Sequence, residues 1–303
     1  MGIAAAVQMI LAGGIVAVPT ETVYGLAARA DCDLAVAQIY RAKGRPDFNP
    51  LIVHVADVAM AEKLAVFDDR AKALARAFWP GALTMVLSRR TDAPLAAAVS
   101  ACLPTVALRC PAHPAMQALL RDCGLPLAAP SANRSGAVSP TSVTHVVASL
   151  GESVPLILDG GTCVQGIEST IVALRSGGKW ALLRLGPIDL AQIRDVLGQA
   201  QQQILPDAAR IEAPGQLLSH YAPGKPMRLN AQVADPDEVL IGFAEVAGHV
   251  SLSPNGNLAE AAARLYFCLH TAAAAQQPRI AVAPVPNEGI GAAINDRLRR
   301  AAV

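Results

Sequence analysis

The sequence predicts an α/β protein with two domains and a mixed β-sheet in the first of them. The chain has 303 residues, which is about twice the usual length of one domain. Apolar strand-like segments alternate with helical ones, yet some strand-like segments follow one another directly, which is typical of a mixed rather than a purely parallel sheet. Residues 199–226, rich in glutamine, proline and glycine, interrupt this pattern and are the best candidate for a linker.

Breaker and capping residues set the predicted elements of the first domain, residues 1–198. Gly13 and Gly14 end the first helix, Asp33 caps the next one, and Gly44 lies just past its end. Thr141 caps a later helix. The predicted helices cover residues 3–12, 34–43, 57–65, 69–78, 114–122, 142–149 and 189–197. The predicted strands cover residues 14–18, 51–55, 82–88, 105–109, 126–130, 155–158, 170–174 and 180–185.

Residues 227–303 are predicted to form a small Rossmann-like α/β domain. Asn257 caps its first helix, and Glu260 has the spacing of a capping box. The predicted strands cover residues 239–243, 249–252 and 279–285, and the predicted helices cover residues 257–275 and 289–301. Because a segment of this length has little room for a core of its own, we expect it to lean on the first domain.

Composition and charge narrow the classes of function. The chain has 25 Lys and Arg against 24 Asp and Glu, a net charge of +1, and it is 53% hydrophobic. These values exclude disorder of the whole chain and argue against a broadly basic protein that coats nucleic acid. They leave room for a local basic pocket.

The sequence also predicts a cytoplasmic protein that does not enter a membrane. The apolar start of the chain has no basic residues before it and is broken by Gly13 and Gly14, so it does not fit a signal peptide. No apolar stretch reaches the length of a membrane-spanning helix without a Pro or Gly break. The cysteines form no C-x-x-C pair and no zinc-finger spacing, so we expect buried thiols in a reducing compartment, with no disulfide and no metal site. They are Cys32, Cys102, Cys110, Cys123, Cys163 and Cys268.

Polar side chains directly follow the first predicted strand, in residues 19–26 (Pro-Thr-Glu-Thr-Val-Tyr-Gly-Leu). Ligands of α/β sheets bind at strand ends, where the hydroxyls of Thr20 and Thr22 and the carboxylate of Glu21 would lie. The alternative is that the threonines cap a turn and Glu21 is solvated. The residues alone favour neither interpretation.

A loop rich in glycine and proline brings two cations and an amide together. Lys43 offers a point charge, Arg45 a bidentate fork, and Asn49 follows closely, a combination suited to phosphates. The simpler interpretation is that the cations complement a helix dipole, but this does not explain Asn49. His54, inside an apolar strand, is by itself more often a core histidine than a ligand contact.

Further polar groups stand at strand ends. Arg109 ends an apolar strand and needs an anionic partner, from the protein or from a ligand. Ser131, Asn133 and Ser139 stand in a small-residue segment that could approach phosphate oxygens, although an ordinary loop has the same composition. Ser169, in Glu-Ser-Thr at residues 168–170, precedes a strand.

Several nucleotide and hydrolase signatures are absent from the sequence. It contains no G-x-S-x-G elbow, no Walker A loop and no G-x-G-x-x-G fingerprint. Arg184 stands within the last strand of the first domain and is unremarkable alone. A nucleotide, if bound, is therefore bound in an unorthodox way.

Taken together, these segments resemble the threonylcarbamoyl-AMP synthase family, in its long form with a YrdC-type domain and a C-terminal domain. The matching segments are residues 19–26, Lys-Gly-Arg-Pro and Asn-Pro-Leu-Ile-Val-His within 43–54, Ser-Ala-Asn at 131–133, Glu-Ser-Thr at 168–170, Ser-His-Tyr-Ala-Pro at 219–223 and Ala-Ala-Ile-Asn-Asp-Arg-Leu at 292–298. The resemblance spans essentially the whole chain. It implies a YrdC-like mixed twisted sheet with helices around a concave pocket.

The resemblance implies a reaction in which L-threonine, bicarbonate or CO2 and ATP give threonylcarbamoyl-adenylate and pyrophosphate. ATP would enter as a substrate with Mg²⁺, and no tightly bound metal is expected. The product would pass to a separate transferase that modifies a tRNA adenosine, and a direct contact with tRNA is left open. Positioning and anion stabilisation would do most of the work.

The resemblance also implies residue roles. Lys43 and Arg45 would be the catalytic pair. The L-threonine subsite would hold Thr22, His54, Arg109 and Ser169, with Arg109 pairing the substrate carboxylate. The ATP side would hold Lys43, Arg45, Asn49, Thr105, Ser131, Asn133, Ser139, Arg184 and Tyr221. Tyr221, with His220 beside it, would close the pocket from the linker.

Two alternatives remain at this stage. One is a carbamoyl-adenylate-forming carbamoyltransferase of the same fold, whose chains carry zinc-binding cysteine motifs that this sequence lacks. The other is a non-catalytic module that binds double-stranded RNA or tRNA. The near-neutral charge and the 4% aromatic content argue against a broad basic RNA surface.

Overall fold

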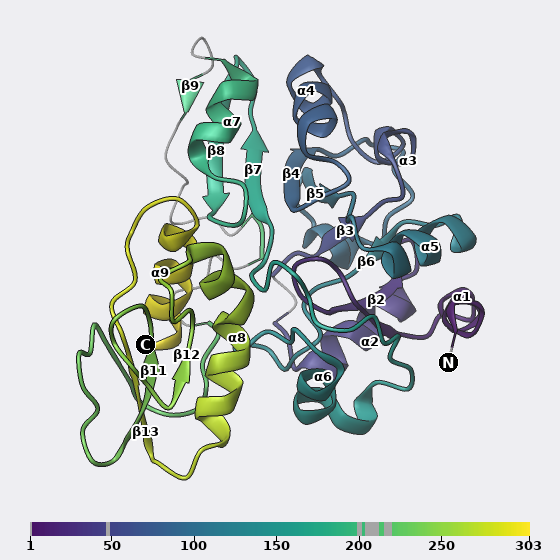
Figure 1. Ribbon diagram of the computed structural model, residues 1–303. Helices are drawn as coiled ribbons and strands as arrows, with labels where there is room; N and C mark the ends of the chain where they lie inside the picture. Colours follow the sequence, from purple (N-terminus) through teal and green to yellow (C-terminus); the bar gives the residue numbers. More distant parts are fainter. Residues whose placement is uncertain (1, 47–48, 199–201, 204–211, 215–219) are drawn as a thin grey trace.

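A mixed β-sheet runs through the first part of the chain in the computed structural model, which describes residues 2–46, 49–198, 202–203, 212–214 and 220–303 (Figure 1). Its strands are β1 (Val16–Val18), β2 (Gly25–Arg29), β3 (Ile52–His54), β4 (Leu83–Ser88), β5 (Thr105–Arg109), β6 (Leu127–Ala128), β7 (Thr170–Leu174), β8 (Lys179–Arg184) and β9 (Gln202–Gln203). Within the described residues, their order is β1-β2-β6-β3-β5-β4-β7-β8-β9. The pairs β3–β5, β4–β7 and β8–β9 are parallel and the others antiparallel, which confirms the mixed sheet.

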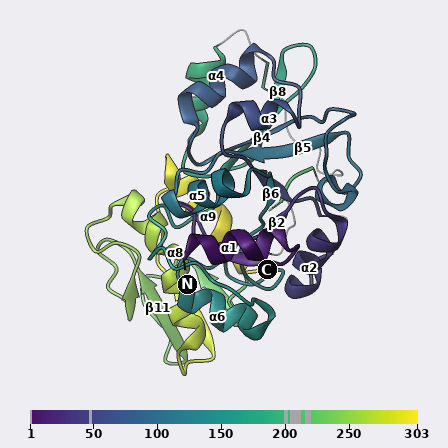
Figure 2. The same cartoon turned by 90° about the vertical axis from the view of Figure 1, so that its right-hand side faces the viewer.

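Helices surround this sheet. They are α1 (Ile3–Leu11), α2 (Asp33–Lys43), α3 (Val58–Glu62), α4 (Asp69–Phe78), α5 (Pro114–Cys123), α6 (Val143–Leu150) and α7 (Leu190–Leu197), with short 3-10 turns η1 (Ala97–Ser100) and η2 (Gly151–Ser153). Helix α1 packs on α5 beside β2, and α4 packs on α7 (Figure 2). Every helix predicted for the first domain is therefore confirmed, with ends that shift by a few residues.

Two predicted caps are wrong, and one predicted C-cap is confirmed. Asp33 is the first residue of α2, and Cys32 holds the N-cap position without a side-chain hydrogen bond. Ser142 rather than Thr141 caps α6, since its hydroxyl accepts the N–H of His145. Gly44 ends α2 in the left-handed region, with φ of 58°.

The strand predictions miss β2, and they include one segment, residues 155–158, that is not a strand. Gly25–Arg29 contains no β-branched residue, and it becomes a strand because it pairs with β1 on one side and β6 on the other. Residues 155–158 are not a strand in the structure. They contribute an isolated parallel bridge between Ala17 and Ile157 instead.

The second sheet is wholly parallel, as the Rossmann-like prediction requires. It comprises β10 (Met227–Leu229), β11 (Glu238–Gly242), β12 (Val250–Ser251) and β13 (Arg279–Val282), in the order β10-β13-β11-β12. Helices α8 (Leu258–Ala274) and α9 (Ile290–Ala301) lie between this sheet and the first domain (Figure 1). Asn257 caps α8 as predicted, but Glu260 accepts the hydroxyl of Ser253 instead of completing a capping box. Strand β10 lies outside the predicted strands.

The division into residues 1–198, a linker at 199–226 and residues 227–303 stays a proposal. Most of 199–226 lies outside the described residues, and the described pair Gln202–Gln203 extends the first sheet as β9.

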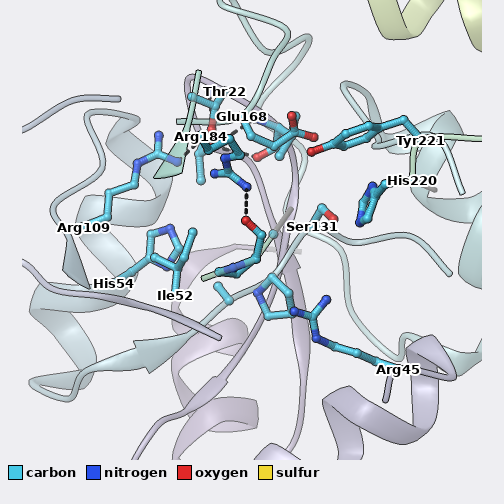
Figure 3. A pocket seen from close by; sticks show the side chains of 16 residues that line it. Thr22, Arg45, Ile52, His54, Arg109, Ser131, Glu168, Arg184, His220 and Tyr221 are labelled. Carbon is cyan, nitrogen blue, oxygen red and sulfur yellow. Dashed lines mark hydrogen bonds between the residues drawn. The ribbon is translucent and has the colours of Figure 1, made fainter. Parts of the chain in front are cut away.

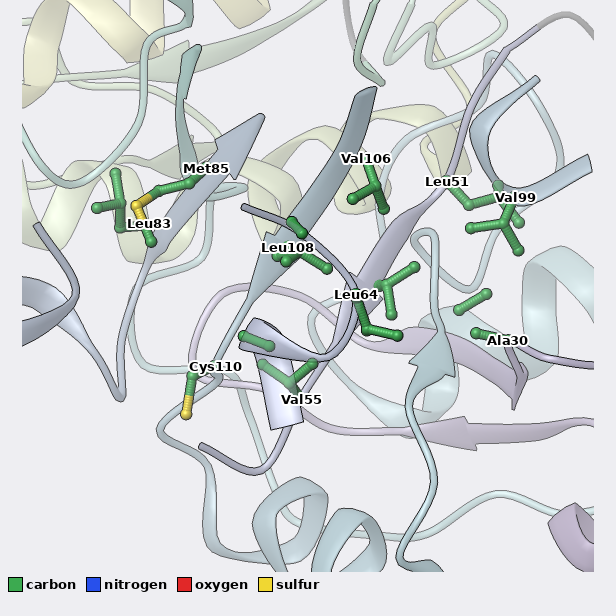
Figure 4. Close-up of a cluster of buried hydrophobic side chains, with 14 of the residues drawn as sticks. Ala30, Leu51, Val55, Leu64, Leu83, Met85, Val99, Val106, Leu108 and Cys110 are labelled. Carbon is green, nitrogen blue, oxygen red and sulfur yellow. The ribbon is translucent and has the colours of Figure 1, made fainter. Parts of the chain in front are cut away.

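Each sheet has its own apolar core. The first core fills the space between its sheet and the surrounding helices, with side chains such as Leu83, Met85 and Leu108 fully buried (Figure 4). The core of the second domain takes in Val23 and Ile167 from the first domain. The small second domain therefore leans on the first, as expected from its length.

The prediction that the cysteines are buried is confirmed for four of the six. All six cysteines lie in the described residues and are free. Four are buried, whereas Cys32 is half-buried and Cys102 is exposed, contrary to the expectation of burial. In the described part of the chain, no helix combines the length and the apolarity needed to cross a bilayer.

Gly166 marks a very close backbone approach between the two domains. Its φ is 69°, and a Cβ at this position would overlap the carbonyl oxygens of Ala262 and Ala263 on α8. Gly161 has a similar φ of 77°, but a Cβ there would meet open space.

This pair of glycines predicts a difference in stability. Gly161→Ala should lower the free energy of unfolding by about 1–2 kcal/mol, the strain of a left-handed residue. Gly166→Ala should lower it by clearly more, because the new methyl group also pushes α8 away. Urea unfolding of both variants measures the difference, and equal losses would contradict the close domain contact.

Candidate functional site

An open cavity lies in the first domain beside described residues of the linker, and the space within it, open solvent included, is about 550 Å³ (Figure 3). Its lining residues come from the β1–β2 loop, β2, the loop after α2, β3, β5, the segment after β6, the segment before β7, the end of β8, and the linker. They are Thr20, Thr22, Val23, Gly25, Arg45, Ile52, His54, Arg109, Ala129, Pro130, Ser131, Glu168, Arg184, Pro214, His220 and Tyr221.

The structure brings most of the predicted site residues to this cavity. Those that line it are Thr22, Arg45, His54, Arg109, Ser131, Arg184 and Tyr221. Lys43, Ser139 and Ser169 stand behind the lining and hydrogen-bond to it. Asn133 joins them through Lys43. Asn49 and Thr105 do not line the cavity, although Asn49 hydrogen-bonds to Arg45 through its backbone oxygen.

Lys43 is a fully enclosed cation. It is the last residue of α2, and its Nζ donates to the backbone oxygens of Ser131 and Asn133. Burial and the positive charge of Arg45 hold the pKa of Lys43 well below its usual range. Burial thus disfavours the ammonium form of Lys43, and the two backbone oxygens that its Nζ contacts favour it.

Arg184 is also buried and Arg45 is half-buried, and both face neutral oxygens. Arg45 donates to the backbone oxygens of Asn49 and Pro50, at 3.2 and 2.9 Å. Arg184 donates to the backbone oxygen and the hydroxyl of Ser169, at 2.9 and 3.0 Å. Burial, together with the charge of Arg184, lowers the pKa of Arg45 to about 10.

Among the described residues, Lys43, Arg45 and Arg184 make no ion pair with a carboxylate. Buried cations are normally paired. Two buried basic groups and a half-buried one that face carbonyl and hydroxyl oxygens create a positive region suited to a polyanion such as a phosphate chain.

Arg109, by contrast, has a carboxylate partner. Its Nη2 lies 2.6 Å from Oε1 of Glu21, its Nη1 donates to the hydroxyl of Thr22 at 2.9 Å, and its Nε donates to the backbone oxygen of Gly81. Burial alone would raise the pKa of Glu21, but Arg109 outweighs it and the net shift is downward. Glu21 is therefore buried and ionised, and the interpretation as a solvated residue is wrong.

His54 lies beside Arg109 and is neutral. Burial, and then the charge of Arg109, lowers the pKa of His54 to about 3. Its Nδ1 is buried and has no hydrogen-bond partner in the described residues. The interpretation as a satisfied core histidine does not fit this unpaired atom.

Of the eight unpaired buried side-chain atoms among the described residues, four belong to predicted site residues, and the others belong to Arg89, Gln165, Trp180 and His220. Besides His54 Nδ1, the atoms at predicted site residues are Asn49 Oδ1, Thr105 Oγ1 and Asn133 Oδ1. Such atoms are rare in folded proteins and each calls for an explanation. A polar ligand would supply the missing partners of the four atoms at predicted site residues.

Sequence reasoning missed a carboxylate that lines the cavity and its partners in the second domain. Glu168 accepts hydrogen bonds from Ser139, from Tyr266 on α8 and from Arg297 on α9. Burial alone would raise the pKa of Glu168, but Arg297, Arg184 and Ser139 together lower it to about 2. Only the three-dimensional contact marks this pairing, since 129 residues separate Glu168 from Arg297.

The linker adds one wall of the cavity. Tyr221 is buried, has φ of 65°, and stacks on Tyr266 with ring centroids 5.7 Å apart. His220 packs against Tyr221, with ring centroids 4.1 Å apart. Ser219 of the same motif, and Asp47 and Phe48 of the loop after Arg45, lie outside the described residues.

The described residues hold no group of three or more His, Cys, Asp or Glu side chains that could bind a metal ion. The cavity thus combines a cationic side, a neutral histidine beside an Arg–Glu pair, and a carboxylate whose two oxygens are both hydrogen-bonded. This arrangement can bind and orient an anionic substrate beside a second polar one.

Two family models cover nearly the whole chain. Residues 8–186 match the Sua5, YciO and YrdC family, described as "Telomere recombination". Residues 188–303 match "Threonylcarbamoyl-AMP synthase, C-terminal domain".

Individual relatives agree with both models. The chain is 38% identical to the threonylcarbamoyl-AMP synthase of Bacillus subtilis (strain 168), over 99% of this chain and 92% of the relative. It is 35% identical to that of Pyrococcus abyssi, over 95% and 90%. The crystal structure of P. abyssi Sua5 complexed with L-threonine superposes with a TM-score of 0.90 at 34% identity, covering 99% of this chain and 94% of that one. The predicted fold is therefore confirmed.

The buried histidines predict a loss of stability in mild acid. The pKa values of His54 and His220 fall to about 3 and about 4, chiefly through burial. Below pH 6.5 the unfolded chain takes up protons that the folded chain does not, so stability falls as the pH falls from 6.5 toward 4. Each such histidine should contribute about 1.4 kcal/mol per pH unit in this window.

Urea unfolding between pH 7.5 and 5 measures this slope. His54→Gln should flatten it by the share of one histidine. A slope that His54→Gln leaves unchanged would contradict the neutral buried imidazole.

Proposed function

The chain belongs to the threonylcarbamoyl-AMP synthase family, and we propose that it makes threonylcarbamoyl-adenylate and pyrophosphate from L-threonine, bicarbonate or CO2 and ATP. The observation that carries this proposal is a set of three basic side chains without carboxylate partners in the described residues, around one cavity: the buried Lys43 and Arg184 and the half-buried Arg45. The product would serve the threonylcarbamoyladenosine modification of tRNA.

The chemistry needs positioning more than covalent help from side chains. The threonine amine attacks CO2 and loses a proton, which gives a carbamate. A carbamate oxygen then attacks the α-phosphorus of ATP, and the bond to pyrophosphate breaks. The protein must hold two anions close together and stabilise the charge that moves to pyrophosphate.

We assign the triphosphate to the cationic side of the cavity. Lys43 and Arg45 would act as the catalytic pair that stabilises the leaving pyrophosphate, and Arg184 would hold the phosphate chain from β8. The unpaired oxygens of Asn49, Thr105 and Asn133 would find partners on the nucleotide. Ser131, Ser139 and Tyr221 complete the proposed ATP side.

ATP would enter with Mg²⁺. Glu168 has both carboxylate oxygens occupied by Ser139, Tyr266 and Arg297. We therefore propose that the phosphates and water, rather than a protein carboxylate, provide the ligands of the ion.

We assign threonine to the side formed by Thr22, His54, Arg109 and Ser169. Arg109 uses three of its five N–H groups within the protein, which leaves two for the substrate carboxylate. His54 is neutral, so its unpaired Nδ1 is available to a polar group of threonine. Ser169 hydrogen-bonds to Arg184 and thus stands between the two subsites.

The family membership favours this activity over both alternatives. A concave cavity in a chain with a net charge of +1 also suits small substrates better than an RNA duplex does. Because the product is a reactive mixed anhydride, a separate transferase must consume it. We place the protein in the cytoplasm, where six free cysteines stay reduced.

Pyrophosphate release should depend on threonine and bicarbonate together. Lys43→Met and Arg45→Ala should each lower this turnover by about 10²–10³-fold, because each removes a positive side chain that would stabilise the leaving pyrophosphate. Lys63→Ala, at an exposed site, is the matched control and should keep wild-type turnover. Pyrophosphate release that needs no threonine would contradict the proposed activity, and wild-type turnover in both pocket variants would contradict the phosphate assignment.

Arg109→Lys should affect one substrate selectively. A lysine keeps the charge beside Glu21 but loses the fork that binds a carboxylate. We expect KM for threonine to rise about tenfold or more while KM for ATP stays within about twofold. Steady-state kinetics with each substrate varied in turn gives both values. A parallel rise of both would place Arg109 elsewhere in the reaction.

A further inference from the structure

A buried ion pair joins the two domains at the wall of the cavity. Nε of Arg297, on α9, lies 2.9 Å from Oε2 of Glu168, and both side chains are almost inaccessible to solvent. Tyr266 on α8 donates its hydroxyl to the same carboxylate, and Arg297 also donates to the backbone oxygen of Leu185. The second domain thus supplies the positive charge, Arg297, that pairs with Glu168 of the first domain.

Glu168 places a negative charge where the phosphate chain of ATP is proposed to bind. It lines the same cavity as Arg184 (Figure 3). Ser169 follows Glu168 directly and hydrogen-bonds to Arg184. A carboxylate here would repel an anionic ligand, and it would compete with that ligand for Arg184. Among the described residues Glu168 makes no ion pair with Arg184, and its oxygens point to Ser139, Tyr266 and Arg297 instead.

Building on the proposed function, we propose that Arg297 is a positioning residue for ATP: it neutralises Glu168 and thereby leaves Arg184 free for the phosphates. The role of the C-terminal domain is then electrostatic as well as structural. Nothing in this role requires Arg297 to touch the substrate.

The surroundings of Arg297 support this role. Its guanidinium lies 5.3 Å from the ring centroid of Tyr221, the linker residue that closes the cavity. Tyr221 in turn stacks on Tyr266. The same two side chains of the second domain, Arg297 and Tyr266, therefore hold both Glu168 and the linker wall. The low pKa of Glu168, about 2, means that a charge is there to be neutralised at neutral pH.

Two variants of the same ion pair test the proposal because they change the charge in opposite directions. Arg297→Met leaves Glu168 uncompensated, and we expect it to weaken the binding of a non-reactive ATP analogue about tenfold or more. Glu168→Gln removes the negative charge, and it should not weaken that binding. The double variant Glu168→Gln/Arg297→Met should bind the analogue within about threefold of wild type.

Arg299→Met is the matched control, since it removes one positive charge from the exposed face of the same helix. It should change the binding of the analogue by less than about twofold. Titration calorimetry with α,β-methylene-ATP gives the affinities, and a rise in KM for ATP without a comparable rise in KM for threonine should accompany Arg297→Met.

If the Arg297–Glu168 ion pair only holds the two domains together, the result is different. Both single variants would then weaken binding alike, and the double variant would not recover, which would overturn the proposal. If Arg297→Met does not fold, Tyr266→Phe removes only one donor to Glu168. Tyr266→Phe should measurably weaken the binding of the ATP analogue, and the double variant Tyr266→Phe/Glu168→Gln should restore that binding. Failure of that recovery would overturn the proposal too.

These measurements separate the inference from the proposed activity. A wild-type protein that binds the ATP analogue but releases no pyrophosphate with threonine would refute the activity. The binding series would still decide whether Arg297 shields Glu168.

Discussion

The structure depends on how buried charge is compensated. Five charged groups converge on the cavity from its lining or directly behind it, and burial is costly for each unless an opposite charge or hydrogen bonds offset it. They are Lys43, Arg45, Arg109, Glu168 and Arg184. The two carboxylates nearby, Glu21 and Glu168, pair with Arg109 and Arg297. The remaining three cations face only carbonyl and hydroxyl oxygens, so the described cavity has an excess of positive charge that a ligand must balance.

This compensation explains why the site needs the whole chain. Lys43 ends a helix, Arg109 ends a strand beside β3, and Arg297 comes from the last helix of the second domain. The chain's net charge of +1 is therefore no guide to the cavity, because local charge is set by which residues the fold buries together. The linker contributes Tyr221, which packs on the two residues that hold Glu168.

Much of the fold follows from local pattern, because periodic apolar residues and glycine C-caps act over short distances. Gly44 ends α2 where the sequence indicates, while the caps Asp33 and Thr141 fail by one residue. Strand β2 escapes prediction because its residues have low strand propensity, and only pairing with β1 and β6 makes it a strand.

The residues of the site also divide into those that the sequence indicates and those that only the fold reveals. Residues such as Lys43, Arg45 and Ser131 stand in recognisable segments, so family resemblance points to them from the amino-acid sequence alone. The roles of Glu21 and Arg297 could not be foreseen, since each depends on a partner about 90 or more residues away. A single sequence gives no signal for such a pair.

The two buried carboxylates also share a local design. In each case a carboxylate turns away to an arginine, and the next residue carries a hydroxyl: Thr22 after Glu21, and Ser169 after Glu168. The hydroxyl of Thr22 accepts from Arg109, and that of Ser169 accepts from Arg184. Because adjacent side chains share one backbone, an ion pair that fixes the carboxylate also fixes where the hydroxyl stands. The acidic residues thus serve the cavity by being neutralised, and the precision of the neighbouring hydroxyls depends on how firmly the two arginines, one from each domain, hold them.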